Sequence, residues 1–143
     1  MSTESNLLKT IVNEFEFGER INHLKNIKRG WCDGHGLPYC PYFVESVRNI
    51  VNTKKMPFPI LHPMPDGGIE LEWVGNNWSI NLYYYHNRIG LFHAEQIEGE
   101  DYIMKQIDFR DFSQYNEFVN KVFELTRLER LGQDELQPDH PLS

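Results

Sequence analysis

The sequence contains few cysteines and no long run of apolar residues. Its 143 residues include two cysteines, Cys32 and Cys40, which are too few for a disulfide framework. No stretch approaches the roughly 20 apolar residues that a membrane-spanning helix requires, and residues 1–17 lack the basic and apolar regions of a secretory signal. We therefore expect no membrane association and a cytoplasmic location.

Basic residues are also scarce, because 14 Lys and Arg stand against 21 Asp and Glu, for a net charge of −7. Proteins that bind nucleic-acid phosphates normally present a net basic surface, so direct nucleic-acid binding is not expected. The charge is uneven: residues 1–55 hold eight basic and six acidic side chains, and residues 56–143 hold six and 15. One alternative, nucleic-acid binding through the early basic residues, rests on Lys25, Lys28, Arg29, Lys54 and Lys55.

The hydrophobic and aromatic content, 40% and 13% of the chain, is that of a protein that folds around a core. The length fits one domain. We expect a single α+β domain over residues 1–132 and a flexible polar tail over residues 133–143. No cofactor is expected.

Apolar residues spaced three and four apart predict three helices. The first covers residues 5–28, with Phe15 in its buried stripe and Gly18 as a point where it could bend. The second begins at Pro41 and ends within residues 52–55. The third is capped by Asp111, with Gln114 completing a capping box, and ends at Gly132.

Alternating apolar and polar residues predict four strands. Residues 69–73 and 78–84 form a hairpin with Trp73 on the helix side, and residues 89–94 and 102–109 follow. The prolines of residues 57–65 exclude a central strand there. The result is a four-stranded antiparallel meander with two N-terminal helices and a C-terminal helix packed on one sheet face.

The other sheet face combines tyrosines with carboxylates, a composition typical of a recognition surface. Glu95, Glu98, Glu100 and Asp101 add an acidic segment beside it, which is typical of a solvated loop and also of a patch that attracts a basic partner. The predicted partner-binding residues are Glu70, Glu72, Asn81, Tyr83, Tyr85, Phe92, Glu95, Glu98, Glu100 and Asp101. Alternatively, these side chains only stabilise the sheet, or they meet a second copy of the chain in a homodimer.

Two groups of residues are compatible with an alternative interpretation, an enzyme or a metal site. Cys32, His35 and Cys40 have ligand chemistry, but their spacing matches no zinc signature, and a fourth ligand must come from His62, His86 or His93. Cys40 precedes a predicted helix start, where a thiol can become nucleophilic. Glu70 and Glu72, roughly 7 Å apart on one strand face, suit acid–base work or a divalent ion.

Two motifs carry a resemblance to a known family. The segments Trp31-Cys32-Asp33-Gly34-His35-Gly36 and Pro63 to Trp73 resemble a family of small uncharacterised bacterial proteins with Trp-Asp-Gly-x-Gly and Gly-Gly-x-x-Leu-Glu-Trp motifs. The chain departs from the pattern by inserting Cys32. The resemblance implies a fold and a bacterial or mobile-element origin, and no activity. The same residues suit structural turns: Trp31, Asp33, Gly34, Gly67, Gly68 and Trp73.

Together these features predict a non-enzymatic acidic protein that docks on a basic protein partner. An inhibitor of a nucleic-acid-handling complex, or an antitoxin of a mobile genetic element, has this size and charge. The alternative is a small hydrolase or metal-dependent enzyme that uses the Cys and His residues or Glu72.

Overall fold

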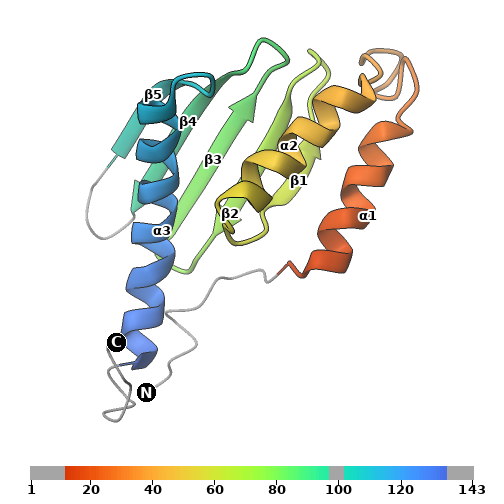
Figure 1. The fold of residues 1–143 in the computed structure, drawn as a ribbon. Helices are drawn as coiled ribbons and strands as arrows, with labels where there is room; N and C mark the ends of the chain where they lie inside the picture. Colours follow the sequence, from red (N-terminus) through yellow and green to blue (C-terminus); the bar gives the residue numbers. More distant parts are fainter. Residues whose placement is uncertain (1–11, 97–101, 135–143) are drawn as a thin grey trace.

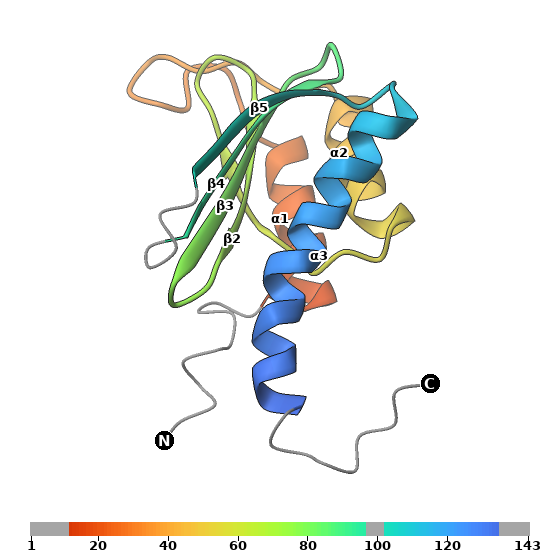
Figure 2. The same cartoon turned by 90° about the vertical axis from the view of Figure 1, so that its left-hand side faces the viewer.

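A computed structural model describes residues 12–96 and 102–134 of the chain (Figure 1). The described part is an α+β domain, as predicted, in which three helices cover one face of an antiparallel sheet (Figure 2). The elements in chain order are α1 (Glu14–Lys25), α2 (Pro41–Thr53), β1 (Ile60–Pro63), β2 (Ile69–Val74), β3 (Trp78–Tyr84), β4 (Ile89–Gln96), β5 (Tyr102–Asp108) and α3 (Phe112–Asp134).

The sheet has five strands in the order β1-β2-β3-β4-β5, one more than predicted. The additional strand, β1, lies at the edge of the sheet and pairs with β2 alone. Proline cannot donate to a central ladder but is tolerated on an edge strand, and Pro63 is the last residue of β1. The prolines therefore excluded a central strand, as expected, and still allowed an edge strand.

Helix α1 differs from its prediction in length and in its buried face. Asn13 caps it, because the Asn13 Oδ1 accepts the Glu16 N–H at 2.8 Å, and the helix runs through Gly18 without interruption. Phe15 is 74% exposed, whereas Phe17 is buried and begins the core stripe. Two residues turn a helix by about 200°, so the two side chains point in opposite directions. The predicted start, at residue 5, lies outside the described residues.

The other two helices lie close to their predicted ranges. Proline at the first position of α2 suits a helix start, and the predicted stripe on this helix is buried. At α3 the Asp111 carboxylate accepts the N–H groups of Ser113 and Gln114. The Gln114 side chain accepts from the Asp108 N–H instead of closing a capping box. The helix continues to Asp134, two residues beyond the predicted end at Gly132.

The segment before α2 contains the expected tight turn. Cys32 and His35 exchange backbone hydrogen bonds of 2.6 and 2.7 Å, and Asp33 and Gly34 between them have φ values of 48° and 87°. This is the geometry of a type I′ turn, for which Asp-Gly is a preferred pair. Trp31, just before this turn, is partly buried.

The inner face of the sheet and the helices form one core. In β2 and β3, buried and partly exposed residues alternate as predicted, so that Trp73, Ile80 and Tyr84 face the helices. The Trp73 indole donates to the carbonyl of Pro57 at 2.8 Å, which satisfies its one polar atom. Because all three helices lie on this side, the opposite face of the sheet has no covering layer among the described residues (Figure 2).

Candidate functional site

The candidate site is the outer face of the sheet, whose residues are aligned by the strand register. One row across the strands consists of His62, Glu70, Tyr83, Leu91 and Gln106. The next row consists of Ile60, Glu72, Asn81, His93 and Met104. We call these two rows, together with Ser79 and Glu95 of the following row, the outer face. Each of the first two rows gathers residues from all five strands.

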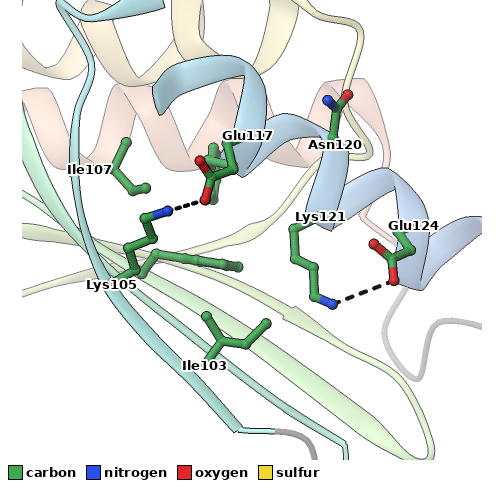
Figure 3. Close-up of a pocket in the computed structure, with 9 residues that line it drawn as sticks. Ile103, Lys105, Ile107, Glu117, Asn120, Lys121 and Glu124 are labelled. Carbon is green, nitrogen blue, oxygen red and sulfur yellow. Dashed lines mark hydrogen bonds and ion pairs between the residues drawn. The ribbon is translucent and has the colours of Figure 1, made fainter. Parts of the chain in front are cut away.

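The charge of the outer face has one sign. It carries the carboxylates of Glu70, Glu72 and Glu95, and no Lys or Arg occupies any of its strand positions. Lys105 is the one Lys or Arg in strands β1 to β5. It lies opposite buried Phe92 and pairs with Glu117 of α3, on the side of the helices (Figure 3).

On strands β1, β2 and β3 the outer face is polar and closely connected. The His62 Nε2 lies 2.9 Å from the Glu72 Oε1, and the Asn81 side-chain amide donates to the Glu70 Oε2 at 2.6 Å. Burial raises the pKa of the neighbouring Tyr83, and the negative charges of Glu70 and Glu72 raise it further. Tyr83 therefore remains a neutral hydroxyl at physiological pH.

On strands β4 and β5 the outer face carries exposed apolar side chains among the polar residues His93, Glu95 and Gln106. Leu91 is 39% exposed and Met104 is 56% exposed, so both present hydrophobic surface to solvent. Leu91 lies directly opposite Tyr83, which joins the apolar part to the polar part. The outer face thus places an apolar area beside carboxylates, an arrangement found where proteins recognise one another.

Phe92 does not belong to the outer face, and its prediction as a partner-binding residue is wrong. It pairs with Leu82, and residues directly opposite on antiparallel strands point to the same face. Because Leu82 is in the core, Phe92 is too: it is 3% exposed, and its ring centroid lies 5.3 Å from that of Phe118.

The other predicted partner-binding residues lie around the face or beyond the described residues. Tyr85 follows β3 and donates its hydroxyl to the Asp66 Oδ2 at 2.9 Å. Burial raises the pKa of Tyr85 to about 12, and Asp66 contributes to the shift. Glu95 is exposed on β4. Glu98, Glu100 and Asp101 fall within residues 97–101, outside the described residues.

The structure does not bring the three candidate ligands Cys32, His35 and Cys40 together as a metal-binding group. Among residues 12–96 and 102–126, the only group of His, Cys, Asp or Glu with metal-binding distances is His62, Glu70 and Glu72. The ligand atoms of these three all lie within 4.8 Å of one another. Sequence reasoning identified the two glutamates but not their pairing with His62, because that pairing depends on edge strand β1.

A separate cavity of about 230 Å³ opens between β5 and α3 (Figure 3). Its lining is apolar at Phe92, Ile103, Ile107 and Phe118. The charged groups beside it are already paired with each other, Lys105 with Glu117 and Lys121 with Glu124. These pairs leave no unbalanced charge for a ligand, so the cavity is a weaker candidate than the outer face.

In the part of the chain that is described, no helix has both the length and the apolar character to cross a membrane. The resemblance to a small bacterial family stays a prediction. No protein-family model, curated protein or solved structure matches the chain.

Proposed function

We propose that the protein is a non-enzymatic binding protein whose outer face docks on a basic protein partner. The observation that carries this proposal is a whole sheet face that the described helices leave uncovered and that bears carboxylates and no Lys or Arg at its strand positions. Such a surface steers a positively charged partner toward it and repels acidic ones.

The apolar side chains of the outer face would add hydrophobic contacts to the electrostatic attraction of the partner. Interfaces combine a hydrophobic centre with a polar rim, and their energy concentrates in a few well-packed side chains. Leu91 and Met104 are exposed beside Tyr83, which offers a broad ring and a hydroxyl. A partner that covers Leu91 and Met104 would place its basic residues over Glu70 and Glu72.

The charge of the face favours a different protein over a second copy of this chain. Two outer faces in contact would bring Glu70, Glu72 and Glu95 of one copy against carboxylates of the other. Like charges placed together in an interface cost several kcal/mol. The homodimer is therefore an outcome of the test and not the proposal.

The class of partner follows from the same chemistry. Proteins that bind nucleic acids carry basic surfaces that match rows of phosphates. The carboxylates of the outer face, held on a rigid sheet, would compete for such a surface. An inhibitor of a nucleic-acid-handling complex, or an antitoxin that neutralises a basic toxin in the cytoplasm of a bacterium, would act in this way.

The test measures binding to the purified basic proteins encoded by neighbouring genes, by calorimetry at low and at moderate salt. The double variant Glu70→Lys and Glu72→Lys, and separately Leu91→Arg, should weaken binding at least tenfold. Glu124→Lys is the matched control, because Glu124 is an exposed residue of α3, on the covered side of the sheet.

Circular dichroism first establishes that each variant is folded. Binding that survives both outer-face variants, or that Glu124→Lys abolishes equally, would contradict the proposal. A concentration-dependent dimer that Leu91→Arg dissociates would favour self-association instead.

A further inference from the structure

His62, Glu70 and Glu72 form a compact group of potential metal ligands on the outer face. His62 of β1 lies directly across from Glu70 of β2, and Glu72 follows two residues later on the same side of the strand. The imidazole nitrogen and the two carboxylate oxygens all lie within 4.8 Å of one another. The paired strands β1 and β2 hold the three backbone positions, so no loop has to fold to assemble the group.

We propose that His62, Glu70 and Glu72 bind one Zn²⁺ ion, with water or a group of a docked partner in the fourth position. One nitrogen and two oxygen ligands match the preference of Zn²⁺, and three protein ligands with an open fourth position are typical of its non-structural sites. Mg²⁺ and Ca²⁺ prefer ligand sets made of oxygen alone, which disfavours them here.

Zinc binding would require only small movements of the ligand side chains from their observed positions. At Zn–ligand distances of about 2.0 to 2.2 Å, tetrahedral ligands are roughly 3.3 Å apart. The His62 Nε2 and the Glu72 Oε1 are 2.9 Å apart and already point at one another. Rotation of the two glutamate side chains closes the remaining separation, with no change in the strands. Binding moves the imidazole proton from Nε2 to Nδ1, or releases one proton to solvent from a charged imidazole.

Asn81 positions one of the ligands. Its side-chain amide donates to the Glu70 Oε2 at 2.6 Å, which leaves the Glu70 Oε1 to face the ion. Hydrogen bonds to ligating carboxylates of this kind contribute about 10 to 100-fold to metal affinity. Asn81 lies opposite Glu72 on β3, so a third strand supports the site.

The electrostatics favour a cation. No Lys or Arg occupies a strand position of the outer face, so His62 is the one side chain of the two ligand-bearing strands that can offset the two carboxylates. The side chains of His62 and Glu72 are 39% and 28% exposed, so an ion can enter from solvent.

The test uses the full-length protein without a histidine tag, freed of metal by a chelator, and titrated with ZnCl₂ by calorimetry. Co²⁺ then serves as a spectroscopic probe, because a four-coordinate site gives strong visible absorption. We expect one ion per chain. His62→Ala and Glu70→Gln should each weaken Zn²⁺ binding more than tenfold, and Asn81→Ala should weaken it about tenfold. Mg²⁺ and Ca²⁺ should bind more weakly than Zn²⁺.

The matched controls are His35→Ala and Cys32→Ser, which change two other potential zinc ligands in the turn between α1 and α2. Both should keep wild-type affinity. The proposal is overturned if Zn²⁺ fails to bind at millimolar concentration. It is also overturned if His62→Ala leaves binding intact while Cys32→Ser removes it. The assay contains no partner protein, so its result is independent of the docking proposal.

Discussion

The Tyr39 hydroxyl donates to the carbonyl of Gly68 at 2.6 Å, across 29 residues of sequence. The same oxygen accepts the backbone N–H of Met64 at 2.9 Å. One side chain, just before α2, therefore holds both ends of the turn that joins β1 to β2. That turn sets the register that brings His62 opposite Glu70.

Replacing Tyr39 by Phe should destabilise the protein by about 1 to 2 kcal/mol. The ring still packs, but the buried contact to the Gly68 carbonyl is lost, and an unmade buried hydrogen bond costs this much. Urea unfolding followed by circular dichroism measures the change. Tyr42→Phe is the control, because Tyr42 is 85% exposed and should change stability by less than about 0.5 kcal/mol. Equal losses in both variants would refute the role of Tyr39.

Alkaline pH should destabilise the protein through a second tyrosine, the partly buried Tyr115. Tyr115 donates its hydroxyl to the Ile50 carbonyl at 2.7 Å, and burial, followed by the influence of Tyr84, raises its pKa to about 12. An unfolded tyrosine titrates near pH 10, so between about pH 10 and 12 the unfolded chain has released a proton that the native chain keeps. The contribution of Tyr115 to stability is complete below pH 10 and is lost as the pH rises toward 12.

The measurement is the free energy of unfolding at a series of pH values from 8 to 11.5, for the wild type and for Tyr115→Phe. The variant should lose less stability over the alkaline part of the range. Parallel slopes for the two proteins would contradict the assignment. Absorbance at the phenolate wavelength provides an independent readout of the number of tyrosines that titrate late.

Truncation of two adjacent residues of β4 should reduce stability by very different amounts. Phe92→Ala removes a ring that is 3% exposed and packed on Phe118, and a loss of about 3 to 5 kcal/mol is expected. Leu91→Ala removes an exposed side chain from the outer face and should cost less than about 1 kcal/mol. Thermal unfolding of both variants tests the pair, and a larger loss for Leu91→Ala would contradict the described strand register.

These two residues also show what the sequence could predict. In residues 69–84 the alternation of large apolar and polar side chains is strict, so the hairpin and its buried face were predicted correctly. In β4 the inner position Gly90 has no side chain to reveal the alternation. Its backbone is covered instead by Leu82 and Phe109, which a Cβ atom at that position would approach within 2.7 and 3.0 Å. The sequence therefore could not show on which face of the sheet Phe92 lies, because that depends on how β4 pairs with β3.

The candidate metal site was predictable only in part for a similar reason. Glu70 and Glu72 are two residues apart on a strand, which places both on one face whatever the rest of the fold. His62 joins them only because a proline-rich segment pairs as an edge strand, in a register set by a turn between residues 63 and 69. In a hairpin the turn fixes the register, so the alternation of residues 69–73 does not by itself place His62 opposite Glu70.

The two proposals lead to a joint prediction, because the zinc ligands are also the carboxylates that would meet a basic partner. A bound Zn²⁺ ion offsets the charges of Glu70 and Glu72, so saturating zinc should weaken the affinity for the partner several-fold. The coupling is reciprocal, and the partner should weaken zinc binding by the same factor. Calorimetric titrations of partner into zinc-loaded and chelator-treated protein measure it. In Glu70→Gln, which cannot hold the ion tightly, zinc should leave partner affinity unchanged. Tighter partner binding in zinc would show instead that the partner completes the coordination of the ion.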